Sequence, residues 1–371
     1  MSASQRVMIA AVFALVAAAG IARVTAAEFQ GLGSPDLFVH QVHGVSSDGA
    51  IAVGSRWHPV KDADHAVMWK DGVVTDLGTL GGRRSWASKI TDDGLIVGGS
   101  DDGSGNSLAV YWRAGTMTPL RFRPDAPDHY GSANGVSADG SVIVGTTSLG
   151  SAQQAFRWVR DSAGKGVMTT FGASDGRGSE ALDTSADGSV VVGFVYYSSD
   201  TVSQLAFRWV KATRGRTGGG TMTVLRSGRD TESAAQAMSL DGAVVVGFRE
   251  IATGRREAFR WERGVMTGLG ALRGGEFLHS EASAVSGDGN VVVGDAENAS
   301  GALEAFRWTK ADGMKSVSQL LEAAGIRLDG WYLNTATAVS KDGRVIVGNG
   351  RNPADKEQAW RAVIDLPASR P

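Results

Sequence analysis

Residues with side chains suited to acid–base or metal chemistry are few in this chain and lie far apart. The 371 residues include 6 His and no Cys, which excludes thiolate nucleophiles, disulfides and Cys-ligated zinc. His279 and Glu281 stand two residues apart and could bind a metal or exchange a proton, yet the sequence places no third partner beside them. The motifs G-x-x-x-x-G-K-S/T and H-E-x-x-H do not occur. We therefore assign no catalytic residue, no metal site and no cofactor from the sequence.

A second set of residues combines aromatic rings with charges of both signs, as a ligand-binding concavity requires. For any single member, a variable solvated loop is the simpler interpretation. As a set, they are our candidate ligand-binding site, and each lies in a non-repeating stretch of an otherwise repetitive chain. The members are His40, Arg84, Trp86, His129, Tyr130, Glu180, His279, Glu281, Trp331 and Tyr332.

The composition favours a chain of short strands and tight turns. There are 51 Gly but only 8 Pro, and 42% of the residues are apolar, which argues against wholesale disorder. No G-X-Y period appears, so collagen is excluded. The net charge of −2 comes without a basic stripe, so we expect no nucleic-acid partner.

An Asp-Gly pair recurs seven times along the chain. It is followed each time by a β-branched run ending in Gly, such as 190–193, and by a third run, such as 154–158. The first six units add a fourth short run, such as 265–269. The pairs are Asp48-Gly49, Asp93-Gly94, Asp139-Gly140, Asp187-Gly188, Asp241-Gly242, Asp288-Gly289 and Asp342-Gly343.

Seven units of four strands predict an all-β fold, a seven-bladed β-propeller. A four-stranded sheet cannot bury both of its faces alone, whereas sheets stacked around an axis bury them and leave short edges. The Asp-Gly pair would make the first hairpin turn of each blade, with Gly at positive φ and Asp bonded to its own backbone. An open β-solenoid and an autotransporter-like β-helix are the competing architectures.

The two ends of the repeat region predict how the ring closes. The seventh unit ends near 358–366 without a fourth strand, and residues 28–33 resemble the fourth strand of unit five. We expect this N-terminal strand to complete the last blade, which removes an open sheet edge.

Repeated aromatic and arginine positions are expected to be structural. Trp158, Trp209, Trp261 and Trp308 share one slot and should be largely buried between blades. The neighbouring position holds an arginine in several units, such as Arg157. The aliphatic part of this side chain should cover the adjacent sheet, and its guanidinium group should meet a carboxylate or an aromatic face. Residues 101–106 are similar in composition to a calcium-binding loop but lack its ligand spacing and closing Glu, so we interpret them as a polar turn; a calcium site is the alternative.

One short helix near residues 318–325 is expected after the sixth unit. Ser316 and Gln319 stand at capping-box spacing, Leu320 and Leu321 provide an apolar face, and Gly325 is a natural stop. We predict that this helix plugs one end of the central channel; the alternative is that it forms a wall of the binding site.

The N-terminal segment has the features of a secretory signal. Arg6 precedes an apolar run of about 16 residues, shorter than the ~20 that span a bilayer, and small residues follow. We expect residues 1–27 to be a signal peptide and residues 28–371 to be the propeller. The mature protein is then a secreted or periplasmic monomer without a membrane span; the alternative is an uncleaved anchor.

Several of these motifs resemble the HAF repeat of probable extracellular bacterial proteins. The resemblance rests on the stretch 76–82, on 85–87 with 90–98, and on a C-terminal stretch from 320 through 360, and it covers nearly all of 40–365. His65-Ala66-Val67 is the nearest copy of the naming tripeptide, and other units replace the His, which argues against a catalytic role for it. The resemblance implies export and a repeat fold but no activity.

For function, we expect an exported, non-enzymatic binding module. Its site would lie on the top face, the end where each fourth strand leads into the next blade, and its ligand would be a glycan, a peptide or another envelope partner. The alternative is a propeller-type lyase or lactonase with His and carboxylates at the channel, with or without a metal; a purely structural role is a third possibility. Convergence of His40, His129, His279, Glu180 and Glu281 would favour the enzyme, and dispersal would favour binding.

Overall fold

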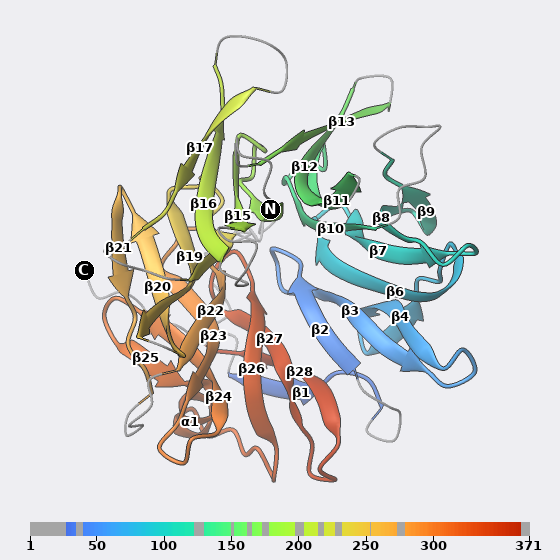
Figure 1. The fold of residues 1–371 in the computed structure, drawn as a ribbon. Helices are drawn as coiled ribbons and strands as arrows, with labels where there is room; N and C mark the ends of the chain where they lie inside the picture. The colour runs from blue at the N-terminus through green and yellow to red at the C-terminus, as the bar shows by residue number, and fades with distance from the viewer. Residues whose placement is uncertain are drawn as a thin grey trace, which may run out of the picture.

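Seven four-stranded antiparallel sheets follow one another around a common centre and form the predicted seven-bladed β-propeller (Figure 1). The computed structural model describes residues 27–34, 40–121, 130–149, 152–161, 165–172, 178–196, 204–213, 219–226, 232–252, 254–272 and 279–364. Residues 1–26 of the expected signal peptide lie outside these ranges. Within them, no helix has the length and apolar character needed to cross a membrane.

Blades 1 to 4 each comprise four strands that are consecutive in the chain, the first being innermost. Blade 1 contains β2 (His40–Val45), β3 (Ile51–His58), β4 (Ala63–Lys70) and β5 (Val73–Asp76). Blade 2 contains β6 (Gly81–Ile90), β7 (Ile96–Asp102), β8 (Ser107–Arg113) and β9 (Thr116–Pro119). Blade 3 contains β10 (Gly131–Val136), β11 (Val142–Leu149), β12 (Ala152–Arg160) and β13 (Gly166–Phe171). Blade 4 contains β14 (Ser179–Thr184), β15 (Val190–Tyr196), β16 (Gln204–Lys211) and β17 (Gly220–Val224).

Blades 5 and 6 follow the same order, and blade 7 borrows its fourth strand from the N-terminal end. Blade 5 contains β18 (Ser233–Met238), β19 (Val244–Ala252), β20 (Arg255–Glu262) and β21 (Val265–Gly268). Blade 6 contains β22 (Ser280–Val285), β23 (Val291–Glu297), β24 (Leu303–Thr309) and β25 (Gly313–Ser316). Blade 7 contains β26 (Tyr332–Val339), β27 (Val345–Arg351), β28 (Glu357–Val363) and β1 (Glu28–Gly31).

The closing strand is confirmed where it was predicted. In Figure 1 the blue β1 lies beside the red β28, and their register runs from Glu28 opposite Val363 to Gly31 opposite Trp360. The Trp331 ring packs against this strand so closely that a Cβ on Gly31 would lie 2.6 Å from it. The strand is therefore fixed by side-chain packing as well as by its ladder.

The Asp-Gly turns behave as the sequence predicts. All seven glycines have positive φ, between 66° and 79°. In the first turn, Asp48 Oδ1 accepts hydrogen bonds from Ser46 Oγ at 2.6 Å and from the Ala50 N–H at 3.0 Å. A Ser or Thr two residues before the Asp makes the same bond in every blade. The turn is thus a complete local unit that the fold uses seven times.

Neighbouring blades are also joined by backbone hydrogen bonds at the turns. Each bond links the residue before the Asp of one turn to its counterpart in the next blade, with N···O distances of 2.8–3.1 Å. Ser47 replaces this bond with one to the Asp92 side chain. The bonds are Ala138 N to Ala186 O, Ala186 N to Leu240 O, Leu240 N to Gly287 O, Gly287 N to Lys341 O and Lys341 N to Ser47 O.

A buried serine joins blades at the opposite end. Ser179 begins β14, accepts a hydrogen bond from the Ala155 N–H of the preceding blade at 3.0 Å and donates one to the Phe171 carbonyl at 2.9 Å. Ser85, Ser233 and Ser280 accept the same bond from their preceding blades. This contact was not predicted from the sequence.

The repeated aromatic and arginine side chains pack between blades. Trp158 and Trp209 are buried, while Trp261 and Trp308 are partly buried against the neighbouring cores. Four arginines of the third strands donate to the carbonyl of the turn glycine in the next blade, at 3.1–3.3 Å: Arg157, Arg208, Arg260 and Arg361. Two of them also meet a carboxylate or an aromatic face, as predicted: Arg260 donates to Glu262 Oε2 at 2.7 Å, and Arg208 lies over the Trp261 ring.

Helix α1 (Val317–Ala323) forms where predicted but does not plug the channel. Ser316 is its N-cap and accepts from the Gln319 N–H at 3.1 Å. Leu321 is fully buried in the core shared by blades 6 and 7, together with Leu333 and Trp360. No helix residue lines the described channel cavity, so the plug prediction is wrong. The apolar face of α1 packs instead into the seam between blades 6 and 7, which lies closer to the helix.

Candidate functional site

The two ends of the propeller differ in the loops they carry. The turn face holds the Asp-Gly turns, and the top face holds the loops that enter each innermost strand. Of the predicted binding residues, His129 lies outside the described residues. The others are distributed over blades 1, 2, 3, 4, 6 and 7 and do not meet at one point.

His40 is buried at the start of the innermost strand of blade 1. Its ring is 1% exposed, packs edge-on against Trp69 at 6.0 Å, and lies so near Gly33 that a Cβ there would be 2.8 Å away. Neither ring nitrogen has a hydrogen-bond partner. Burial, and then the charge of Arg56, lowers the pKa of His40 to about 4. The structure thus holds this ring neutral.

Arg84 and Trp86 are each engaged with a neighbour. Arg84 Nε lies 3.0 Å from an Asp101 carboxylate oxygen. Trp86 Nε1 donates to Ser132 Oγ in blade 3 at 3.3 Å, and its ring covers Gly99, where a Cβ would lie 2.1 Å away. Trp86 therefore contributes to blade packing, while the Arg84 side chain stays largely exposed.

Tyr130 and Glu180 belong to a small cluster of blades 3 and 4. Tyr196 donates its hydroxyl to Glu180 Oε1 at 2.7 Å. Burial, and then Glu180, raises the pKa of both Tyr196 and Tyr130. Both phenols consequently remain protonated, and Glu180 is the one charge of this cluster.

Trp331 and Tyr332 lie beside the closing strand and blade 6. The Trp331 ring meets Phe29 edge-on at 5.3 Å. The Tyr332 hydroxyl donates to the Leu303 carbonyl at 3.0 Å, and burial raises its pKa. Through these contacts both rings contribute to the packing of the fold, whether or not they also contact a ligand.

His279 and Glu281 form part of a charged cluster at the seam of blades 5 and 6. Arg256 donates to Glu281 at 2.7 Å and to Glu232 at 3.0 Å, bridging the two blades. His279 Nε2 lies 3.6 Å from the same Glu281 oxygen. The four side chains are between 22% and 34% exposed, so a ligand can reach them.

Asp295 adds a third carboxylate to this cluster. It is the cross-strand partner of Glu281 in the ladder between β22 and β23. Burial, and then the Glu281 charge, raises the pKa of Asp295 to about 7. Arg256 lies over the Phe248 ring at 4.2 Å, which fixes its position. Arg256 and Asp295 were not predicted from the sequence, although Glu281 and Asp295 each stand seven residues from Asp288 of the turn and are therefore opposite each other.

The central channel is lined by a β-bulge from every blade. Each innermost strand carries one unpaired residue at the same position, and all seven line a cavity of about 370 Å³. Three of the side chains bond to a backbone carbonyl of the next blade at 2.9 Å: His43, Asn134 and Thr337. The bulge residues are His43, Ser88, Asn134, Leu182, Gln236, Ser283 and Thr337.

An ion pair crosses this channel. Lys89 Nζ of blade 2 lies 2.5 Å from Asp183 Oδ1 of blade 4. The buried Asp183 also accepts from the Met238 N–H of blade 5 at 3.0 Å and from the Thr184 N–H at 2.8 Å. The carboxylate is fully engaged and ties three blades together. None of the predicted binding residues lines this cavity.

Solved structures similar to this chain are propellers. An oligogalacturonate lyase in complex with manganese has a TM-score of 0.58 at 12% identity, covering 92% of this chain and 94% of its own. An oligogalacturonate lyase from Vibrio parahaemolyticus has a TM-score of 0.57 at 10% identity, covering 94% and 96%. The β-propeller domain of the Trilobed protease from Pyrococcus furiosus has a TM-score of 0.55 at 9% identity, covering 89% and 94%.

At these identities the similarity shows the fold alone. No family model matches the chain, so the resemblance to the HAF repeat is not confirmed, and no curated protein matches it either. The fold of this chain is thus established as a seven-bladed β-propeller.

Proposed function

We propose that the protein is an exported binding module whose top face takes a basic peptide segment of an envelope partner. The observation that carries this proposal is the cluster at the seam of blades 5 and 6. Two carboxylates, Glu232 and Glu281, contact one permanent cation, Arg256, and a third, Asp295, lies opposite Glu281 in the ladder. The cluster therefore has an excess of negative charge that a lysine or arginine side chain of a partner would neutralise.

The dispersal of the other candidates supports binding over catalysis. His40 is in blade 1, Glu180 in blade 4, and His279 with Glu281 in blade 6, each engaged with different neighbours. Acid–base catalysis requires the reacting groups within hydrogen-bond reach of one substrate atom. A binding surface has no such requirement, because separate contacts add along an extended ligand.

The state of Asp295 supports a cationic ligand. In the described part of the chain this carboxyl has no hydrogen-bond or ion-pair partner, and its raised pKa reflects burial beside a second carboxylate. A ligand ammonium group placed there favours the ionised form and lowers that pKa again. Binding should accordingly strengthen as the pH rises through 7.

Export and membership of the HAF repeat family are parts of the same proposal. They are supported by the apolar N-terminal run and by the repeated motifs around 76–98. An envelope location would expose the top face to peptides and surface polymers rather than to nucleotides.

The proposal is tested by titrating the protein into fluorescein-labelled octalysine and following fluorescence anisotropy. Each lost carboxylate removes about 1 kcal/mol of attraction in water-like surroundings. The double variant Glu232→Gln, Glu281→Gln should therefore bind about 10- to 30-fold more weakly. The affinity of the unmodified protein should increase between pH 6 and pH 8.

The matched control is Glu322→Gln, which removes an exposed carboxylate on α1, away from the cluster. This variant should bind octalysine like the unmodified protein, and labelled octaglutamate should not bind at all. Equal weakening in both variants would reduce the interaction to overall charge and contradict the proposed site.

A further inference from the structure

Blade 1 brings two histidines and a carboxylate together at one corner of its top face. His58 ends β3, His65 lies near the start of β4, and Asp76 ends β5. His65 is paired with Arg56, two residues before His58, while Asp76 is paired with Val67, two residues after His65. Because side chains alternate along a strand, all three residues point to the same face of the sheet.

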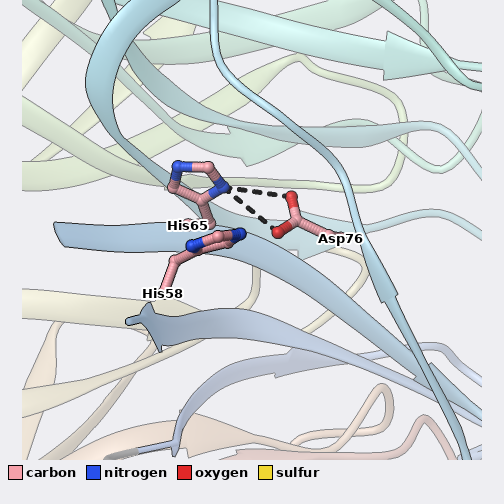
Figure 2. A group of neighbouring side chains, drawn as sticks. All are labelled: His58, His65 and Asp76. Atoms are coloured by element: carbon pink, nitrogen blue, oxygen red, sulfur yellow. Dashed lines mark hydrogen bonds and ion pairs between the residues drawn. The ribbon is translucent and has the colours of Figure 1, made fainter. Parts of the chain in front are cut away.

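The three side chains contact one another (Figure 2). His65 Nδ1 lies 3.1 and 3.2 Å from the two carboxylate oxygens of Asp76. The rings of His58 and His65 have centroids 4.7 Å apart at an angle of 41°. One nitrogen of each ring and a carboxylate oxygen all lie within 4.8 Å of one another.

The surroundings hold two of these groups in place. His65 is 5% exposed, and its Nε2 is buried without a hydrogen-bond partner. Asp76 Oδ1 accepts from the Gly78 N–H at 2.8 Å, and Arg56 lies 3.8 Å from Oδ2. The Asp76 carboxylate is thereby oriented toward the rings by groups outside the cluster, as ligating carboxylates commonly are.

The same corner in other blades shows what the fold alone requires there. In blade 6 the three equivalent positions hold Asn298, Glu304 and Ser316, and Glu304 bonds to both of the others. In blade 7, Asn352 donates to Gln358 at 3.1 Å. These corners are satisfied by amide, carboxylate and hydroxyl groups. A set of two imidazoles and one carboxylate occurs in blade 1 alone among the described corners.

We propose that His58, His65 and Asp76 bind a divalent transition metal ion, and specifically Zn²⁺. Neutral imidazole nitrogen and carboxylate oxygen are ligands that Zn²⁺ accepts at about 2.0–2.2 Å in tetrahedral geometry. Ligand atoms in such a site are about 3.4 Å apart. The distances between His65 Nδ1 and the Asp76 oxygens are already near this value, whereas the limit of 4.8 Å that encloses all three ligand atoms exceeds it by about 1.4 Å. His58 is half-buried at the end of its strand, so its ring can make this adjustment.

The proposed site supplies three protein ligands and leaves a fourth position for water or an exchangeable group. The ion would join β3, β4 and β5 at one end of the blade. This site is independent of the cluster at blades 5 and 6, which lies on other strands and has a different donor set.

Isothermal titration of the purified, metal-free protein with ZnCl₂ tests the proposal. We expect one Zn²⁺ per chain and a higher thermal unfolding midpoint when it is bound. His65→Ala and Asp76→Ala should each weaken binding by at least about 100-fold, since loss of a ligand exceeds the ~10- to 100-fold cost of losing its outer-shell partner. Asp64→Asn is the matched control, because Asp64 precedes His65 on the same strand but points to the opposite face, and it should bind Zn²⁺ normally.

A second variant separates metal binding from folding. The triple substitution His58→Asn, His65→Glu, Asp76→Ser installs the hydrogen-bonded corner of blade 6 in blade 1. This variant should keep the unfolding midpoint of the metal-free protein and lose the response to Zn²⁺. Stoichiometric binding that persists in the triple variant, or an unmodified protein that binds no Zn²⁺, would overturn the proposal.

Discussion

The turn face and the top face of this propeller are built from the same seven repeats but differ in what they repeat. At the turn face, every blade uses the same Ser/Thr–Asp–Gly unit. At the top face, the corners of blades 1, 6 and 7 hold three different polar sets. A group that recurs in all blades satisfies a requirement of the fold, whereas a group that occurs once is free to serve a ligand.

The largest difference is expected between two glycines with positive φ. Gly188 at the turn face has φ of 66°, and a Cβ there would lie 2.5 Å from Val142; Gly105, in the top-face loop of blade 2, has φ of 83° and nothing within 4 Å. Gly188→Ala combines backbone strain with overpacking and should cost about 3 kcal/mol. Gly105→Ala should cost about 1 kcal/mol. Chemical denaturation measures the free energy of unfolding of both variants. Equal losses would show that the turn face and the top face do not differ in how strictly they require glycine.

The buried serine between blades tests whether any top-face residue is required by the fold. Ser179→Ala leaves the Ala155 N–H and the Phe171 carbonyl without a partner inside the protein. We expect a loss of about 2 kcal/mol in the free energy of unfolding. Ser104→Ala, in an exposed loop, is the matched control and should change stability by less than about 0.5 kcal/mol. A neutral Ser179→Ala would show that the inter-blade bond is dispensable.

Two groups of the top face, the buried His40 and the half-buried Asp295, should give opposite pH dependences of stability. The pKa of His40 is lowered to about 4, so the unfolded chain binds more protons below pH 6.5 and stability falls as the pH falls from 7 to 5. This loss is on the order of 2 kcal/mol and should vanish in His40→Leu. The pKa of Asp295 is raised to about 7, so its contribution makes stability fall as the pH rises from 4 through 7.

The pH dependences that His40 and Asp295 contribute are separated by measuring the free energy of unfolding of His40→Leu and of Asp295→Asn from pH 4.5 to 8. Asp295→Asn should have a higher free energy of unfolding than the unmodified protein at pH 8, and the two values should be equal at pH 4.5. An unchanged profile in either variant would mean that the group titrates alike in the folded and unfolded chains.

The smallest effect is expected from a turn-face carboxylate. The hydrogen bond from Ser185, followed by the Ser189 N–H, lowers the pKa of Asp187. Its contribution is therefore present at neutral pH and is lost as the pH falls through the acidic range. Asp187→Asn should cost about 1 kcal/mol at pH 7 and flatten the acid limb of the stability profile. A cost confined to acidic pH would contradict this assignment.

The sequence was sufficient for the features that repeat locally. The Asp-Gly turns follow from the need for positive φ, and the number of blades follows from counting the repeated runs of alternating residues. The closing strand follows from the missing fourth strand of the seventh unit. Each of these features is visible along one stretch of chain. The contacts between blades were not predictable in this way. Lys89 and Asp183 are 94 positions apart, and only the curvature of the ring brings them across the channel.

The candidate site was predicted in part. His279 and Glu281 were named because they do not repeat, but Arg256, which bridges Glu281 to Glu232, comes from the third strand of the preceding blade. The helix was predicted from its cap and apolar face, yet those features do not specify which groove the apolar face fills. Cross-blade register, rather than local pattern, decides both outcomes.

The central claim, that recurrence marks the structural face and divergence marks the binding face, is tested most directly by hydrogen–deuterium exchange with and without octalysine. We predict added protection at the top-face ends of blades 5 and 6, within 232–236, 254–258 and 279–283, and none at the seven Asp-Gly turns. Protection at the turns or along the bulge residues of the channel, with 279–283 unchanged, would contradict it.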